Sequence, residues 1–216
     1  MIPWRRTSRD FRRDLRDGVT RVGVALRDPE AFALRLRREP SAYGWTVWAA
    51  LAVTASLGTM LYGVTMGLRF GAAEMFERGA LLTVAAGLAW VFTLPTLYVL
   101  NSLSGSRLTA AQTLLAVLVT VSWGGLAMLA SIPINWFFTA ALEELPNTVN
   151  VSFWVLVVNL TVFAGVGLAM SDVFARVLST LEPERGQTAA WSLALVAVLG
   201  TELFWTFGLF QYHLPT

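Results

Sequence analysis

Long stretches without charged side chains constrain the fold of this sequence more than any other feature. Five such stretches cover residues 43–68, 79–101, 109–132, 151–171 and 187–207. Only Glu202 interrupts them, and each is at least as long as the roughly 20 residues that an α-helix needs to cross a bilayer. Backbone polar groups in hydrocarbon must be bonded within the protein, which favours helices. We therefore predict an all-α, polytopic membrane protein with a five-helix transmembrane bundle.

The composition supports this prediction and excludes several kinds of chemistry. Only 14% of the 216 residues are charged, whereas soluble domains average about 25%. The chain has no Cys and a single His, which rules out disulfides, thiolate metal sites and a His pair for haem. All 16 basic residues are Arg, so a Lys Schiff base is impossible, and HExxH, GxSxG and Gly-rich phosphate-loop motifs are missing. We expect a protein that is not an enzyme and uses no cofactor, metal or nucleic-acid partner.

Charge divides the chain near Pro40 into a basic amphipathic arm, residues 1–40, and a membrane domain, residues 41–216. The arm holds 11 Arg against six acidic residues, and the membrane domain holds five Arg against eight. With a cytoplasmic N-terminus, 14 Arg lie inside and only Arg69 and Arg78 lie outside, in agreement with the positive-inside rule. The exclusive use of Arg is typical of a GC-rich bacterial genome. We predict a bacterial inner membrane protein with its N-terminus in the cytoplasm and its C-terminus outside.

The sequence of the arm predicts two amphipathic helices. Apolar residues between Phe11 and Leu26 recur every three or four positions, and Asp28 with Pro29 forms a cap and first-turn pair for a second helix. We expect a helix pair that lies in the membrane plane and contacts anionic lipid, or docks a cytoplasmic partner. The candidate lipid-contact residues are Arg12, Arg13, Arg16, Arg35, Arg37 and Arg38. The simpler alternative is that these residues only fix the orientation of the chain and are otherwise solvated.

The link between the second and third membrane helices is predicted to be a cytoplasmic hairpin. Pro95 kinks the second helix, Ser and Gly residues form the turn, and Arg107 lies at the headgroups. Tyr98 and Asn101 are one helical turn apart, and Asn101 and Gln112 are equally far from the centre of the turn. We therefore predict a hydrogen bond between these two amides. Its simplest role is an interhelical contact worth about 0.6–2 kcal/mol, and the alternative is a catalytic or transport role.

Glu202 is a candidate intramembrane acid. It lies about 15 residues into the last stretch, hence roughly 22 Å along a helix that rises 1.5 Å per residue, in the outer third of the membrane. Carboxylates at this depth are functional candidates as proton sites, ion ligands or partner contacts. The structural alternative is a bond to Thr, to Asn, or to Arg69 or Arg78 in the outer loop.

Glycine pairs and rows predict close contacts between helices. They are Gly63, Gly67 and Gly71; Gly124 and Gly125; and Gly165 and Gly167. We expect a compact bundle in which these positions touch neighbouring helices. Pro133 is predicted to end the third helix at the outer interface.

The hairpin resembles a segment of known proteins. LPTLYVLNSLSGSRLTAAQT is similar to the hairpin of small bacterial and cyanobacterial members of the Yip family of Ypt/Rab-interacting membrane proteins. The matching positions are Leu94, Pro95, Leu97, Tyr98, Asn101, Gly105, Ser106, Arg107, Leu108, Gln112 and Thr113. They cover about a tenth of the chain, and the rest of the resemblance is the five-span topology with a cytoplasmic arm. The resemblance implies roles in vesicle traffic and membrane shaping or, for some bacterial members, assistance to multidrug-type ABC exporters.

Two functional hypotheses follow from the sequence. The first is a non-enzymatic Yip-like accessory or scaffold subunit of a membrane complex, such as an ABC exporter or a membrane-organising assembly. The second is a small transporter or channel-forming subunit that uses Glu202 and the membrane-depth amides. Both predict the lipid bilayer as surroundings, with a membrane-protein partner or further copies of the chain.

Overall fold

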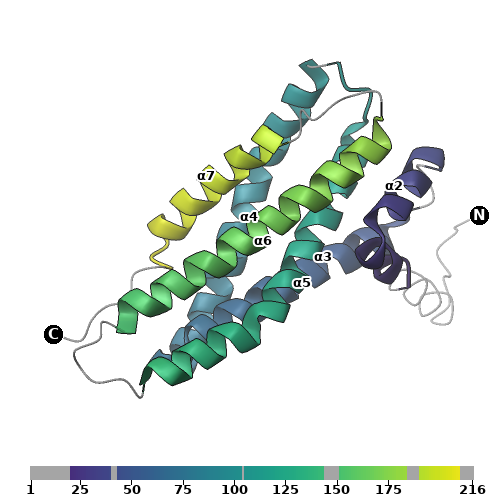
Figure 1. Cartoon of the computed structure of the whole chain (residues 1–216). Helices are drawn as coiled ribbons and strands as arrows, with labels where there is room; N and C mark the ends of the chain where they lie inside the picture. Colours follow the sequence, from purple (N-terminus) through teal and green to yellow (C-terminus); the bar gives the residue numbers. More distant parts are fainter. Residues whose placement is uncertain (1–19, 40–42, 104, 144–150, 184–189, 210–216) are drawn as a thin grey trace, which may run out of the picture.

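The computed structural model consists of helices joined by short connections (Figure 1). It describes residues 20–39, 43–103, 105–143, 151–183 and 190–209. Residues 20–27 are helical. The elements that follow are α2 (Pro29–Arg38), α3 (Trp45–Met66), the short 3₁₀ helix η2 (Leu68–Phe70), α4 (Ala72–Leu103), α5 (Ala110–Glu143), α6 (Val151–Leu181) and α7 (Ala190–Thr206).

In the part of the chain that the structure describes, four helices are long and apolar enough to cross a membrane. They are α3, α4, α5 and α6, with 22 to 34 residues each. The predicted all-α membrane fold is therefore confirmed at this level. The fifth predicted span corresponds to α7, which has 17 residues and is shorter than those four.

Helix α3 provides the main packing surface for two other helices. It packs against both α4 and α5, while α6 packs on α5, and α7 packs on α4 and touches α6. Consecutive helices α4 and α5 touch only sparingly. The chain therefore does not form the closely packed α4–α5 hairpin that the turn sequence predicted, because α3 supplies the main packing surface for both helices.

Glycines allow α3 to approach its neighbours closely. A Cβ built at Gly58 would lie 2.0 Å from the carbonyl oxygen of Gly125 on α5. A Cβ at Gly63 would lie 2.8 Å from the carbonyl oxygen of Arg78, and one at Gly67 would lie 2.6 Å from the Cα of Met75, both on α4. These contacts confirm the predicted close approach of helices at Gly63, Gly67 and Gly125, since no other residue has so small a side chain. Gly58 was not among the predicted positions.

The other predicted glycine positions differ from one another. Gly71 has a φ of +99° and a Cβ there would have nothing within 4 Å, so it serves the turn between η2 and α4. Gly124 faces the side chain of Met170. A Cβ at Gly165 or Gly167 would also have nothing within 4 Å, so neither glycine marks a helix contact in the described part of the chain.

The apolar face of α2 packs on the bundle. Phe32, Ala33 and Leu36 are buried in one cluster with residues of α5 and α6. The Tyr43 hydroxyl donates a hydrogen bond to the carbonyl of Phe32 at 3.2 Å, and the two rings lie 4.5 Å apart. The predicted Asp28 cap is confirmed, because its carboxylate accepts from the amide of Ala31 at 2.8 Å. The apolar face of α2 is therefore buried on protein.

Pro133 lies inside α5 and does not end it. The helix continues to Glu143, so the prediction of a helix end at this proline was wrong. The turns beyond Pro133 remain packed on α3: Asn135 and Thr139 are buried, and the Asn135 side-chain amide donates to the Thr65 hydroxyl at 2.9 Å. Proline is tolerated in membrane helices where neighbouring groups compensate for the lost hydrogen bond.

Candidate functional site

The α4–α5 turn ends in a capping box at the start of α5. The side-chain oxygen of Gln112 accepts from the amide of Thr109 at 2.9 Å and from its hydroxyl at 3.1 Å. The Thr109 hydroxyl accepts in return from the amide of Gln112 at 3.3 Å. This reciprocal pattern satisfies donors that the first turn of a helix leaves open. Gln112 is thereby engaged within its own helix, and the predicted bond to Asn101 is not formed.

A carboxylate at the end of α6 accepts hydrogen bonds from the α4–α5 turn. Glu182 accepts a hydrogen bond from the Ser106 hydroxyl at 2.8 Å and another from the amide of Arg107 at 2.8 Å. The amide of Ser106 donates to the carbonyl of Asn101 at 2.9 Å. Gly105 reverses the chain with a φ of +85°, a conformation that glycine adopts without steric cost. The turn is therefore tied to the end of α6, an element 75 residues further along the chain.

Three further hairpin candidates have exposed side chains. Pro95 and Tyr98 are exposed on α4, and the side chain of Arg107 is exposed at the turn. The structure thus gives this segment a structural role in joining α4, α5 and α6. The sequence did contain the signal for the capping box, a Thr followed three residues later by Gln, whereas nothing in it indicated Glu182 as a partner.

Polar side chains at membrane depth link helices to one another. The Tyr62 hydroxyl on α3 donates to the side-chain oxygen of Asn159 on α6 at 2.9 Å, and both residues are fully buried. The Asn159 amide donates to the carbonyl of Val155 at 2.8 Å. Such bonds hold membrane helices together because lipid offers no competing partners. Tyr62 and Asn159 lie 97 positions apart in the chain, so no local sequence pattern pairs them.

Arg78, at the other end of the bundle, is largely buried. Its Nε lies 3.3 Å from the carboxylate of Glu74, and its Nη1 donates to the carbonyl of Leu209 at 3.1 Å. Its guanidinium also lies 4.9 Å from the ring centroid of Phe70. Arg78 therefore ties the start of α4 to the segment after α7, and it does not serve as the predicted partner of Glu202.

Glu202 is exposed on α7. Of the alternatives predicted for Glu202, which were Thr, Asn, Arg69 and Arg78, the bond to Arg78 is not formed, since that guanidinium contacts Glu74 and Leu209. The opposite face of α7 packs against α4, where a Cβ at Gly200 would lie 3.9 Å from the Cβ of Ala89. The carboxylate thus lies on the side of α7 that is open to the surroundings of the bundle.

The basic residues of α2 remain accessible. Arg35, Arg37 and Arg38 are exposed, and Arg12, Arg13 and Arg16 lie outside the described residues. Arg176 on α6 forms ion pairs with Asp172 at 2.9 Å and with Glu30 at 3.8 Å. In the described part of the chain, the arginines of residues 20–39 lie at the same end of the bundle as the α4–α5 turn, whereas Arg69 and Arg78 lie at the opposite end.

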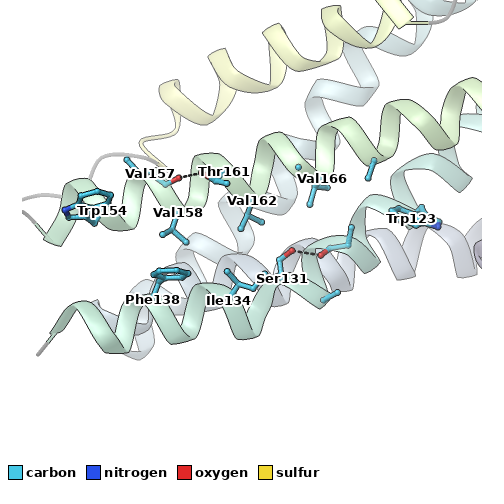
Figure 2. A pocket seen from close by; sticks show the side chains of 14 residues that line it. Trp123, Ser131, Ile134, Phe138, Trp154, Val157, Val158, Thr161, Val162 and Val166 are labelled. Carbon is cyan, nitrogen blue, oxygen red and sulfur yellow. Dashed lines mark hydrogen bonds between the residues drawn. The ribbon is translucent and has the colours of Figure 1, made fainter.

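An open apolar groove runs between α5 and α6 (Figure 2). Its volume is about 760 Å³. Trp123 lies at one end, and Phe138 and Trp154 lie at the other (Figure 2). Between them lie Ser131, Ile134, Val162 and Val166. None of the candidate residues from the sequence lines this groove.

The geometry defines a multi-pass α-helical membrane protein. Among the described residues, no group of His, Asp and Glu side chains is arranged to hold a metal ion. Comparisons of the chain with protein-family models, with curated proteins and with solved structures give no match.

Proposed function

We propose that this chain is a non-enzymatic accessory or scaffold subunit of a bacterial inner membrane complex. The observation that carries the proposal is the outward position of Glu202 on α7. A carboxylate in contact with lipid is costly, so intramembrane acids pair with another group. A donor or cation from a neighbouring subunit would pair with the Glu202 carboxylate. Arg78, one of the partners predicted within the chain, bonds Glu74 and Leu209 instead.

The proposal includes a fifth membrane crossing by α7. Gly200 lies opposite Ala89, and Leu209 bonds Arg78, so α7 runs antiparallel to α4 along its apolar part. Its 17 residues give a length of roughly 25 Å, at the lower limit for a membrane helix. With the two helices aligned in this way, Glu202 lies roughly 12 Å further along α4 than Gly79, toward the middle of the membrane.

The proposal also places the N-terminus in the cytoplasm. The exposed Arg35, Arg37 and Arg38 share one end of the bundle with Arg107 and Arg176. A concentration of Arg at one end supports a cytoplasmic location for that end. We propose that Arg35, Arg37 and Arg38 contact anionic headgroups by charge alone, because the apolar face of α2 is buried on the bundle.

The kind of complex is proposed from the hairpin alone. The resemblance to small bacterial Yip-like proteins rests on residues 94–113, and within this segment the structure gives Gly105 and Ser106 clear roles in the turn. On that basis we propose an ABC exporter or a membrane-organising assembly as the partner. The alternative function is a small transporter subunit. It is supported by the same observation, the exposed carboxylate of Glu202.

Affinity purification from gently solubilised membranes tests the proposal. The tagged chain is expected to retain a membrane-protein partner, identified by mass spectrometry, and Glu202→Gln is expected to weaken that association. Glu77→Gln is the matched control, because Glu77 is also exposed but lies in the first turns of α4. The purified chain in liposomes is expected to move no ions or solute. Flux that disappears in Glu202→Gln would establish the transporter function instead.

A further inference from the structure

The outward face of α7 carries the one ionisable side chain of that helix. Helix α7 packs on α4 along one edge of the bundle (Figure 1), with Gly200 facing Ala89. Val198, Glu202 and Trp205 are exposed. Their spacings of four and three residues place them together on one helix face. A charged group thus lies between two large apolar side chains on the side of α7 that is turned away from the bundle.

The chain supplies no cation at the depth of Glu202. It has no Lys, and its five uncharged stretches contain no Arg. Arg78, at the outer end of the bundle, is engaged in other contacts. The neighbouring hydroxyl of Thr201 donates to the carbonyl of Ala197 at 2.8 Å. Since carboxylates within a membrane pair with another group, the counter-ion of Glu202 has to come from another molecule.

A second copy of the chain does not meet this requirement. Two copies that met through this face about a two-fold axis would place their Glu202 carboxylates side by side, and like charges at close range repel. Lipid headgroups are also too distant, because Glu202 lies roughly 12 Å further along α4 than Gly79, toward the middle of the membrane. The counter-ion therefore belongs to a membrane-spanning segment of a different protein.

We propose that α7 docks a transmembrane helix of a partner protein through one Arg or Lys of that helix, placed at the depth of Glu202. This inference rests on the proposed accessory function and names the chemistry of the partner. The Trp205 ring is 63% exposed and lies three positions from Glu202, a spacing at which helix side chains are neighbours. A cation bonded to the carboxylate also reaches the face of this ring, and the cation–π attraction adds to the ion pair. A neutral donor gains only the hydrogen bond, so this face favours a basic residue.

Binding of designed peptides in vesicles tests this surface. The full chain carries a donor dye at Ser179→Cys, an exposed position near the end of α6 in a chain without other Cys. The probes are leucine-rich transmembrane peptides with an acceptor dye and a single Arg, Gln or Leu at the depth of Glu202. Energy transfer is measured as the peptide fraction in the membrane increases. The Arg peptide is expected to reach half-saturation at a roughly tenfold lower mole fraction than the Gln peptide.

Matched variants assign the preference to individual side chains. Glu202→Gln is expected to abolish it, whereas Glu77→Gln, which changes another exposed acid, is expected to retain it. Trp205→Leu is expected to reduce it roughly two- to fivefold. Glu202→Arg is expected to prefer a peptide with a single Glu, a reversal that loss of folding cannot produce. Equal binding of the Arg and Gln peptides, or a preference that persists in Glu202→Gln, would overturn the proposal.

Two further outcomes distinguish this inference from its alternatives. Energy transfer between donor- and acceptor-labelled copies of the chain that depends on Glu202 would show that a second copy covers this face, and the proposal would be wrong. A Glu202-dependent partner in affinity purification, combined with no preference for the Arg peptide, would leave the accessory function standing and refute the basic helix. A preference for the Arg peptide in a chain that also shows Glu202-dependent flux would support this inference and refute the accessory function.

Discussion

Substitution of Gly58 by Ala is expected to destabilise the bundle, although alanine is the better helix former. The added Cβ would lie 2.0 Å from the carbonyl oxygen of Gly125, whereas ordinary contacts begin at 3.4 Å. Helices α3 and α5 must therefore separate locally by about 1.4 Å. Overpacking of this kind costs about 1–3 kcal/mol, which exceeds the gain of up to about 1 kcal/mol from replacing glycine in a helix.

The same substitution at Gly87 is the matched control. Gly87 also lies inside a helix, but a Cβ there has nothing within 4 Å. Gly87→Ala is therefore expected to leave the protein unchanged or to stabilise it by up to about 1 kcal/mol. One amino-acid change is thus expected to act in opposite directions at two positions.

Unfolding in mixed micelles measures both effects. The nine Trp residues give a fluorescence signal for titration with a denaturing detergent, and thermal unfolding gives a second measure. A net loss of about 2 kcal/mol corresponds to a fall in melting temperature of roughly 4–8 °C for a chain of this size. If Gly58→Ala is as stable as Gly87→Ala, the backbones of α3 and α5 are not in contact at this point, and the reasoning fails.

Three further predictions concern individual contacts. Tyr62→Phe removes the hydrogen bond to Asn159 and is expected to cost about 0.6–1.7 kcal/mol, measured by the same unfolding titration; a double-mutant cycle with Asn159→Ala that shows no coupling would contradict it. Glu182→Ala removes the acceptor of the Arg107 amide and is expected to speed hydrogen exchange at that amide roughly fivefold or more; unchanged exchange there would show that the carboxylate does not hold the turn. Burial raises the pKa of Tyr43 above its usual 10.0, so the contribution of this phenol to stability is full below pH 10 and decreases as the pH rises above it. Between pH 9 and pH 11, Tyr43→Phe is therefore expected to lose less stability than the unsubstituted protein. An equal loss in the two proteins would refute the role of this phenol.

The sequence was sufficient to predict the existence of the membrane helices but not their full lengths. Uncharged stretches locate them because hydrocarbon excludes charge. Helix α6 nevertheless continues to Leu181, past Asp172 and Arg176. These two residues are four positions apart and form an ion pair at 2.9 Å, which stabilises the added turns. A boundary drawn at the first charge therefore underestimates the helix.

The pairing of helices was harder to predict. Equal distance of Asn101 and Gln112 from a turn indicates contact only if the helices on either side pack together. In this structure α4 and α5 are both packed on α3, and Gln112 bonds Thr109. Local signals such as the Asp28 cap were read correctly because their partners are three residues away. The Tyr62–Asn159 bond joins residues 97 positions apart, and no local pattern indicates it.

The packing of α3 against both α4 and α5 bears on how the chain is assembled during synthesis. Of the four long apolar helices, α3 leaves the ribosome first, and domains emerge N-terminal part first. Its glycine-lined surfaces at Gly58 and Gly63 are then already in place when α5 and α4 arrive. Helices α4, α5, α6 and α7 each dock onto a helix that has already been made, whereas α2 finds its partners only after α5 and α6 have been synthesised.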